Sequence, residues 1–283
     1  MKLYIQPNPN RDLNFETALR AAAICADAGA EVWLPTCVPV PERAGVHQAD
    51  TASLEQIRPD VLIALGGDGT MLRAAHEASP LGIPMMGVNL GNVGFLTELD
   101  RTAVGELQSV AEGRFTIEER LMLRCRLYRD GECIYEASAL NDCIIARGEM
   151  FRNISLRLSS DGTEIKTFSG DGMILATPTG STAYSLSAGG PVVDPASNVF
   201  VATPICAHAL YAKSFVLSSD RTVRIDTLRT DGKAVRLSCD GVDSIPMYAG
   251  DFALITRSPL TTRLVKLHGN DFFARLNTKL SER

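Results

Sequence analysis

Residues 61–73 read Val61-Leu-Ile-Ala-Leu-Gly-Gly-Asp-Gly-Thr70-Met-Leu-Arg73. The apolar run predicts a buried strand, the glycines a tight turn, and residues 71–77 a helix. Main-chain N–H groups in such a turn, next to the positive end of a helix, favour a phosphate group as ligand. Asp68 is unusual there, because a carboxylate repels phosphate unless it holds Mg²⁺ or accepts a hydroxyl proton. The stretch predicts either phosphoryl transfer or a tight turn in which Asp68 is the helix N-cap.

The sequence on both sides of this stretch alternates short apolar runs with a helical period. Residues 3–5, 32–34 and 85–88 are expected strands, and residues 15–28 are an expected helix that ends at Gly29. Such alternation predicts an α/β domain with a parallel, doubly wound sheet. We expect this domain to span residues 1–112 and to be completed by the tail, residues 256–283.

The period changes near residue 115. Apolar and polar residues alternate in the segments 123–129, 154–158, 223–225 and 235–239, which indicates half-buried antiparallel strands. Asp-Gly pairs at 130–131, 161–162 and 231–232 are typical of hairpin turns, because both turn positions there have positive φ. Residues 113–255 are therefore expected to form a second, mostly antiparallel β domain.

Other well-known site patterns are missing from the sequence. The Gly-Lys pair Gly232-Lys233 is followed by Ala234 and not by the Ser or Thr of a Walker loop, and Leu72 stands where a dinucleotide fingerprint needs a third glycine. The four histidines are far apart, which disfavours a zinc site, and no Gly-x-Ser-x-Gly elbow of the common hydrolases occurs.

Three further segments have compositions suited to a nucleotide. Residues 89–98 combine close turns with Phe95, which could stack on a base or be an ordinary buried ring. Asn141-Asp142 could bind a ribose diol or form a simple Asx turn. Residues 170–190 are rich in small and hydroxyl side chains, and residues 172–212 contain one formal charge, Asp194. That segment indicates a neutral polar pocket or a subunit interface.

Composition narrows the class of protein. The chain has 283 residues, of which 45% are apolar and 22% charged, and its net charge is −5. These values predict folded domains and give no basic field for a nucleic acid or an anionic membrane. The seven cysteines are scattered without a Cys-x-x-Cys pair, so we expect reduced thiols. The apolar run near Met1 is too short for a signal peptide, and a cytoplasmic location is expected.

With these motifs the chain resembles the bacterial NAD kinases, also called ATP-NAD kinases. The resemblance rests on Gly66-Gly-Asp-Gly-Thr70, Asn89 to Glu98, Asn141-Asp142 and the run from Asp171 to Gly190, in the family's order. Gly66 to Thr70 is shared with phosphofructokinases and with diacylglycerol and sphingosine kinases, whereas Thr177-Pro-Thr-Gly-Ser-Thr-Ala-Tyr-Ser185 is far more specific.

The resemblance implies Mg²⁺-dependent transfer of the ATP γ-phosphoryl group to the adenosine 2′-hydroxyl of NAD, by a homo-oligomer, either a dimer or a tetramer. It implies that Asp68 is catalytic, with Gly69 and Arg73 near phosphate, Asn141 and Asp142 on adenosine, and Asp171 at the nicotinamide end. The residues it implies for the rest of the pocket are Thr182, Ala183, Tyr184, Ser185, Leu186 and Ser187, with Phe95 and Arg152 as weaker transfers. No metal ligand is assigned.

Two departures and two alternatives accompany this resemblance. The family usually has Asn-Glu in place of Asn141-Asp142, and often a Gln where this chain has Val242. A lipid or sugar kinase with the same glycine loop is the alternative enzyme, but a lipid groove or a basic sugar-phosphate pocket is not evident in the second domain. A pyridine-nucleotide sensor without turnover would be expected to lack Asp68.

Overall fold

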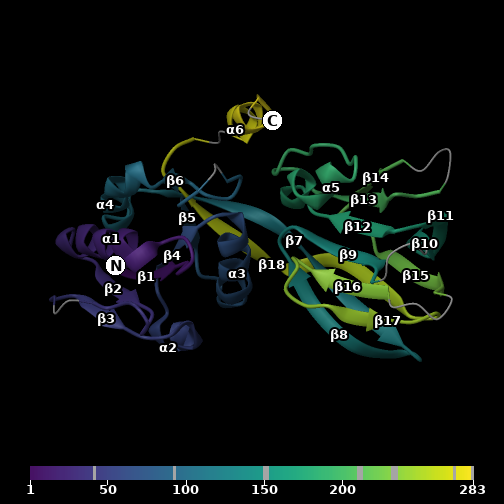
Figure 1. The fold of residues 1–283 in the computed structure, drawn as a ribbon, viewed down its shortest axis with the longest axis horizontal. Coiled ribbons are helices and arrows are strands. Elements are labelled where there is room, and N and C mark those ends of the chain that lie inside the picture. Colours follow the sequence, from purple (N-terminus) through teal and green to yellow (C-terminus); the bar gives the residue numbers. More distant parts are fainter. Residues whose placement is uncertain are drawn as a thin grey trace. The chain divides into compact units, whose positions relative to one another are not determined.

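The computed structural model describes residues 1–40, 43–91, 94–148, 153–208, 213–230, 235–269 and 272–281. The chain divides into two compact units (Figure 1). Unit 1 comprises Met1–Glu119 and Thr261–Arg283, and unit 2 comprises Arg120–Leu260. The two long strands that continue from one unit into the other are β7 (Thr116–Arg129) and β18 (Phe252–Lys266).

Unit 1 is an α/β unit. Its strands are β1 (Lys2–Pro7), β2 (Glu31–Leu34), β3 (Val46–Gln48), β4 (Val61–Gly66), β5 (Met85–Asn89) and β6 (Leu99–Asp100). Its α-helices are α1 (Glu16–Asp27), α2 (Leu54–Ile57), α3 (Asp68–Ala78), α4 (Leu107–Ala111) and α6 (Phe272–Ser281). Short 3-10 helices cover Leu13–Phe15, Thr51–Ser53, Ser79–Leu81 and Thr102–Glu106.

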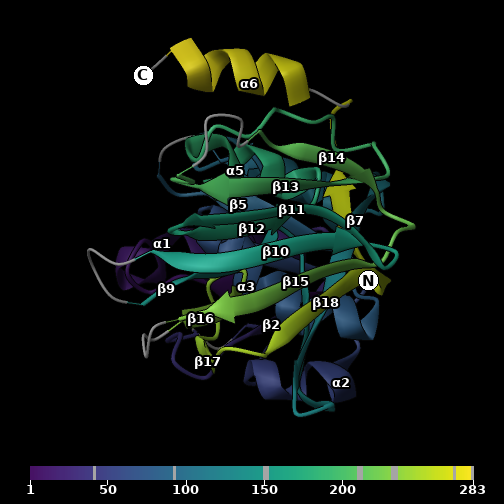
Figure 2. The ribbon, with the colours of Figure 1, turned by 90° about the vertical axis from the view of Figure 1, so that its right-hand side faces the viewer.

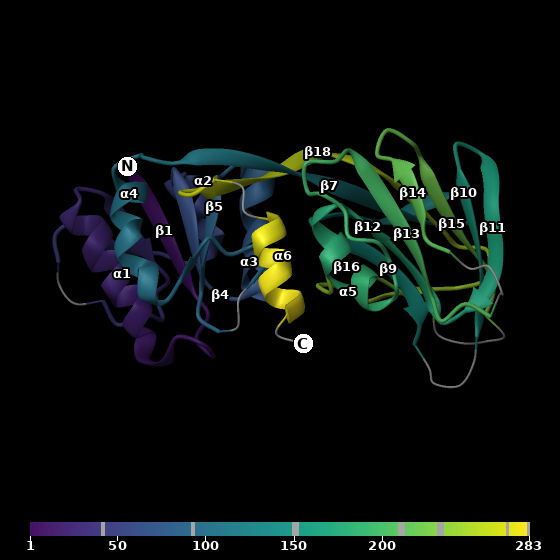
Figure 3. The same cartoon turned by 90° about the horizontal axis from the view of Figure 1, so that it is seen from above.

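The order of the parallel strands in unit 1 places the ends of β1 and β4 side by side. The order is β5-β4-β1-β2-β3, so the chain moves outward in one direction after β1 and in the other after β4. Helices α1 and α4 lie on one face of this sheet and α3 on the other (Figure 3). Strand order therefore reverses between β1 and β4, which is where open α/β sheets bind ligands at their carboxyl ends.

Unit 2 is built from antiparallel strands. They are β8 (Glu132–Ala139), β9 (Asp142–Arg147), β10 (Ile154–Ser160), β11 (Thr163–Gly170), β12 (Gly172–Ala176), β13 (Val199–Ile205), β14 (Phe215–Ser218), β15 (Val223–Arg229), β16 (Val235–Cys239) and β17 (Ile245–Met247). The 3-10 helix Thr179–Thr182 leads to the short helix α5 (Tyr184–Ser187).

Two antiparallel sheets enclose the core of unit 2. One sheet has the order β14-β13-β12-β9-β16-β17, and the other contains β11-β10-β15-β18 together with β7 and β8. Figure 2 shows β10 beside β15 and β15 beside β18. Inward-facing side chains of both sheets, such as Leu123, Ile145 and Leu237, form one buried cluster, as the period-2 alternation in the sequence requires.

The predicted fold class is confirmed in both halves of the chain: unit 1 has the parallel α/β sheet and unit 2 the antiparallel strands. Asp130-Gly131 and Asp161-Gly162 both have positive φ and connect β7 to β8 and β10 to β11, as expected of hairpin turns. The third pair, Asp231-Gly232, lies outside the described residues. None of the helices in the described ranges is long and apolar enough to cross a membrane.

Candidate active site

Asp68 is the first residue of α3 and is separated from β4 by one residue, at the reversal of strand order. Gly67 is the N-cap residue, and the Asp68 side chain faces the loop after β5. Its Oδ2 accepts the N–H of Phe95 at 3.0 Å and its Oδ1 accepts the N–H of Leu96, also at 3.0 Å. The N-cap interpretation of Asp68 is therefore wrong, and two main-chain donors fix its carboxylate.

Glycine is required around this carboxylate because the packing leaves no room for a Cβ atom. A Cβ on Gly94 would lie 2.4 Å from Asp68 Oδ1, and one on Gly66 would lie 2.2 Å from Thr70 Oγ1. Both distances are far inside van der Waals contact. Gly66 thus allows the tight turn from β4 into α3, and Gly94 allows the loop after β5 to approach Asp68.

A polar pocket of about 360 Å³ opens beside Asp68. Its lining consists of main-chain amides, two arginines, two asparagines and one carboxylate, from residues Asn8, Arg11, Gly67, Asp68, Gly69, Thr70, Arg73, Asn89 and Gly91. Asn8 follows β1 and donates through Nδ2 to Thr70 Oγ1 at 3.0 Å. Cationic side chains and a helix N-terminus around one cavity are suited to a phosphate chain.

The loop that holds Asp68 is fixed at its far end by the C-terminal segment of the chain. Arg275 on α6 donates to Thr97 O, and Glu98 accepts hydrogen bonds from Lys266 and from the N–H groups of Leu267 and His268. Burial alone would raise the pKa of Glu98. The pKa is nevertheless lowered, because Glu98 accepts a hydrogen bond from the charged Lys266 and is also stabilised by the His268 N–H and the charge of Arg275. Glu98 is therefore an anionic anchor of this loop.

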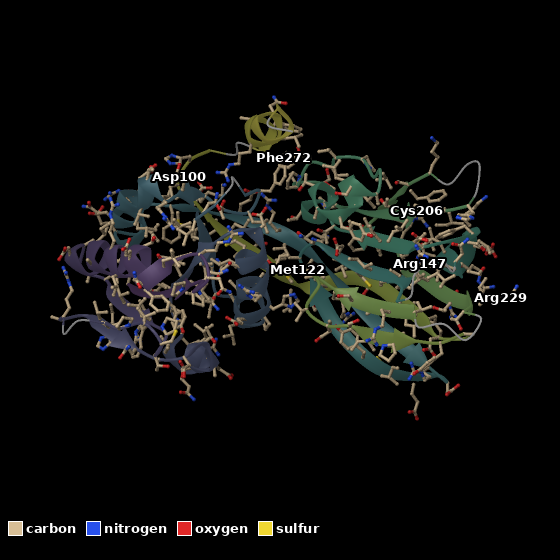
Figure 4. The ribbon with its side chains drawn as sticks, viewed as in Figure 1. Asp100, Met122, Arg147, Cys206, Arg229 and Phe272 are labelled. Carbon is tan, nitrogen blue, oxygen red and sulfur yellow. The ribbon has the colours of Figure 1, made fainter. Side chains whose placement is uncertain are left out.

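Phe95 lies in the same loop and is half-buried. Its ring centroid is 6.4 Å from that of Phe272, which is labelled in Figure 4 at the start of α6. The ring thus has an aromatic partner within unit 1.

In unit 2 the Asn141-Asp142 turn is held by one carboxylate. Asp240, which follows β16, accepts the N–H of Leu140 at 2.7 Å, of Asn141 at 2.8 Å and of Asp142 at 3.1 Å. The Asp240 N–H in turn donates to Asp142 O at 3.0 Å. Three donors converging on one side chain give this turn a fixed conformation at the start of β9.

The hydroxyl-rich segment after β12 packs directly on that turn. The Thr177 N–H donates to Asn141 O at 2.8 Å, and the Thr177 hydroxyl donates to Leu140 O. A Cβ on Gly180 would lie 2.0 Å from Asn141 O, so only glycine allows this approach. The structure therefore brings together two motifs that are separated by more than thirty positions in the sequence.

The predicted pocket residues between 182 and 187 differ in exposure. Tyr184 has 44% of its surface exposed and Ser187 is exposed, while Thr182, Ala183 and Leu186 are half-buried. Ser185 is fully buried, and its Oγ lies 2.8 Å from Thr203 Oγ1. The hydroxyl of Ser185 is thus used inside the unit, whereas Tyr184 and Ser187 can meet a ligand.

Asp171 forms a bidentate ion pair with Arg147, which Figure 4 labels on the sheet of unit 2. Arg147 Nε lies 2.9 Å from Asp171 Oδ1, and the terminal nitrogen Nη2 donates to Oδ2 at 3.0 Å. The pair stands at the opposite end of β9 from Asp142. Arg152, the weaker transfer from the family pattern, lies outside the described residues.

Asp142 is only 4% exposed. Burial, reinforced by the charges of Asp240 and Cys239, raises its pKa to about 7. Its carboxyl group is therefore divided between the neutral and charged forms near neutral pH, and a cationic or hydrogen-bond-donating ligand would favour the charged form.

Sequence reasoning did not assign Asn8, Arg11, Arg147 or Asp240 to the site. Arg147 sits in an alternating strand, and its ion pair with Asp171 depends on the pairing of β9 with β12. Asp240 offered one local signal, because Asp240-Gly241 repeats the Asp-Gly pattern of the hairpins and both residues have positive φ. The contacts of all four residues depend on tertiary structure.

Known proteins are similar to this chain along most of its length. Residues 36–115 match the model of the ATP-NAD kinase N-terminal domain, and residues 140–267 match that of the ATP-NAD kinase C-terminal domain. The NAD kinase of Caldanaerobacter subterraneus subsp. tengcongensis is 37% identical, with 100% of this chain and 99% of the relative covered. That of Symbiobacterium thermophilum is 44% identical over 78% of each chain.

Two solved structures are similar over nearly the whole chain. Yeast NADH kinase complexed with NADH has a TM-score of 0.85 at 27% identity, covering 99% of this chain and 87% of its own. An NAD kinase from Archaeoglobus fulgidus in complex with ATP has a TM-score of 0.78 at 25% identity, and both chains are fully covered. Because both domain models and full-length relatives match, the chain belongs to the ATP-NAD kinase family.

Proposed function

We propose that this chain transfers the γ-phosphoryl group of ATP to the 2′-hydroxyl of the adenosine ribose of NAD, with a divalent metal ion, and forms NADP. The observation that carries the proposal is the Asp68 carboxylate, which two main-chain N–H groups fix beside a pocket lined by amides and arginines. Relatives named NAD kinase and the two nucleotide complexes support it.

Asp68 orients the hydroxyl that attacks. A carboxylate has a reference pKa near 4 and an alcohol a far higher one, so Asp68 accepts the proton late, as the new O–P bond forms. A loose phosphoryl-transfer transition state needs positioning and charge neutralisation above all. The Gly69 amide at the start of α3 and the guanidinium of Arg73 provide that charge neutralisation on the phosphate side.

The residues of unit 2 bind the dinucleotide. Asn141 and Asp142 bind the adenosine part, Asp171 with its partner Arg147 binds the nicotinamide end, and the segment Thr182 to Ser187 lines the pocket. Small side chains such as Ala183 permit a flat ring to approach the backbone. The charged form of Asp142 becomes favourable once the donors of the ligand replace water.

The pocket beside Asp68 fits a divalent metal ion of the Mg²⁺ type. Such ions keep several waters and bind through one or two carboxylates plus substrate phosphates, and Asp68 is the carboxylate of this lining. The N–H groups of Phe95 and Leu96 hold the two Asp68 oxygens in place beside this pocket. When bound, the metal neutralises charge on the phosphate oxygens.

The test is a coupled assay with the purified chain, NAD, ATP and MgCl₂, in which an NADP-specific dehydrogenase reports the product. We expect formation of NADP that stops when ATP is omitted or when the metal is chelated. Phosphorus and proton NMR of the isolated product should place the new phosphate on the adenosine 2′ oxygen. Phosphate at another position, or no product, would overturn the proposal.

The same assay distinguishes NAD phosphorylation from the alternative functions. A lipid or sugar kinase would turn over its own acceptor and leave NAD unchanged, whereas a nucleotide sensor would bind NAD without consuming ATP. The homo-oligomer and the cytoplasmic location stay predictions, and light scattering on the purified chain tests the oligomer. No observation in the described residues favours these alternatives over NAD phosphorylation.

A further inference from the structure

Three cysteines meet in the core of unit 2. They are Cys125 on β7, Cys143 on β9 and Cys239 on β16, all buried, and their Sγ atoms all lie within 4.8 Å of one another. Cys143 Sγ is 3.4 Å from Cys125 Sγ, and Cys143 and Cys239 are directly paired across neighbouring antiparallel strands. Cys125 belongs to one sheet of unit 2, and Cys143 and Cys239 belong to the other, so the cluster joins the two sheets.

From this geometry we propose that Cys125, Cys143 and Cys239 form a binding site for one trivalent thiophilic ion, such as arsenic(III), whose occupancy weakens nucleotide binding. Within the described residues, the ligand group at this place consists of these three sulfur atoms. Sulfur ligands select soft ions. A structural zinc ion normally takes four ligands, whereas trivalent arsenic forms three bonds to sulfur.

The net charge of the complex distinguishes between soft ions of different valence. Three thiolates with a monovalent ion would leave two negative charges in the core, a divalent ion would leave one, and a trivalent ion leaves none. Uncompensated charge is costly in an apolar interior, and this cluster is packed among Leu123, Ile145 and Leu237. The neutral trithiolate complex is therefore the one that the surroundings favour.

The reaction needs no oxidant or reductant. Arsenous acid, As(OH)₃, exchanges three As–O bonds for three As–S bonds, and each displaced hydroxide leaves as water with a thiol proton. Three waters are released, and arsenic stays trivalent. The thiolate form of each cysteine is the nucleophile in these exchanges.

The site is linked through the chain to the proposed nucleotide turn. Cys143 follows Asp142, and Cys239 precedes Asp240, whose carboxylate holds the N–H groups of residues 140–142. A core is close-packed, so an ion between the sheets shifts the strands that carry its ligands. The effect on NAD rests on the proposed function of Asn141 and Asp142, while the binding of arsenic does not.

The experiment begins from a variant in which the exposed cysteines Cys37, Cys133 and Cys206 are replaced by serine; Figure 4 labels Cys206. This background keeps the cluster and the isolated buried Cys25. It is incubated with arsenite in a phosphine reductant, which does not compete as a thiol. Native mass spectrometry should show a gain of one arsenic atom and a loss of three hydrogens.

Cys143→Ala and Cys239→Ala in the same background should lose tight arsenic binding, while Cys25→Ala should retain it. Two cluster variants are used so that one poorly folded protein does not decide the result, and melting curves identify the folded ones. Absence of the arsenic adduct in the background protein, or an adduct that survives in the folded cluster variants, would overturn the site.

Kinetics then test the link to the nucleotide. Arsenite should raise the NAD KM severalfold in the background protein, with slow onset because entry to a buried site requires local opening. An excess of a small dithiol should reverse the change. An unchanged NAD KM in protein that carries the arsenic adduct would overturn the link between the cysteine site and nucleotide binding. A chain without kinase activity would instead refute the proposed function. The mass measurement would still show whether arsenic binds to the three cysteines.

Discussion

At the scale of single residues, Asp68 has two separable tasks in this structure. It accepts two N–H groups that hold the Phe95-Leu96 segment, and it is the carboxylate of the phosphate-type pocket. We expect Asp68→Asn to lower kcat by about a hundredfold or more and to change NAD affinity by less than about tenfold, because orientation and proton acceptance are lost. Steady-state kinetics and calorimetry with NAD measure the two effects.

Asp68→Asn also places an NH₂ group against a main-chain donor, so loss of the loop conformation is an alternative cause. Arg275→Ala is the matched control, because it releases the other end of the same loop at Thr97 without altering the carboxylate. We expect a much smaller loss of kcat in this control. Equal losses in both variants would leave Asp68 as an anchor of the loop only.

Much of the site around Asp68 could be predicted at this scale, because a strand, a glycine turn and a helix follow one another within thirteen positions. The fixing of its carboxylate by the N–H groups of Phe95 and Leu96 could not, since it depends on a loop 27 and 28 positions away. The Arg147–Asp171 ion pair could not be predicted for the same reason, because its two residues are far apart in the sequence. Local sequence identifies the chemistry of a residue, but its partners come from strand pairing.

At the scale of elements, the β8–β9 turn depends on Asp240 at the end of β16. Hydrogen bonds to a charged acceptor contribute about 1.5–3 kcal/mol each, and Asp240 accepts three from residues 140–142. Asp240→Asn should raise the NAD KM by about tenfold and change kcat by less than about threefold, because the turn acts alike in ground and transition states.

Asp243→Asn is the control for this variant, because Asp243 lies in the same β16–β17 connection but is exposed and contacts Tyr135. It should leave both kinetic constants near their normal values. A drop in kcat with normal KM for Asp240→Asn would show that the turn does not bind the nucleotide.

The junction between the 3-10 helix at 179–182 and α5 gives a second element-scale prediction. Ala183 occupies that junction and is half-buried. Ala183→Arg should abolish NAD binding by steric exclusion and leave the melting curve nearly normal, since the added side chain can extend into solvent. Calorimetry with NAD checks this, with Ala183→Gly as the small-residue control. Normal affinity in the arginine variant would place the dinucleotide elsewhere.

The helices and strands of the structure show which elements the periodicity of apolar residues can predict and which it cannot. The helix and strands with clear patterns were confirmed, such as α1 before Gly29 and β4 before the glycines. The short strands β3 and β6 were not predicted, because three and two residues are too few to establish a period. Parallel pairing with β2 and β5 makes them strands.

At the scale of the whole molecule, the buried Asp142 makes folding depend on pH. Burial raises the pKa of Asp142 from its ordinary value of 3.8 to about 7 in the folded chain, so between these values the folded state binds more protons than the unfolded state. The free energy of unfolding contributed by this group therefore falls as pH rises from about 4 to about 7 and is lower but constant above that. The charged form of Asp142 therefore opposes folding above about pH 7.

Asp142→Asn removes this titration and should therefore raise the melting temperature relative to the unmodified chain, by more at pH 8 than at pH 5. Calorimetry on both proteins at the two pH values gives the comparison, and Asp220→Asn, whose wild-type side chain is 82% exposed, is the control in the same unit.

The single tryptophan, Trp33, lies in β2 of unit 1, so its fluorescence follows that unit. If the units unfold separately, the shift should appear in the calorimetric transition that Trp33 does not report. An equal gain at both pH values would show that Asp142 is not the group whose ionisation opposes folding, because only a titrating carboxyl makes the difference depend on pH.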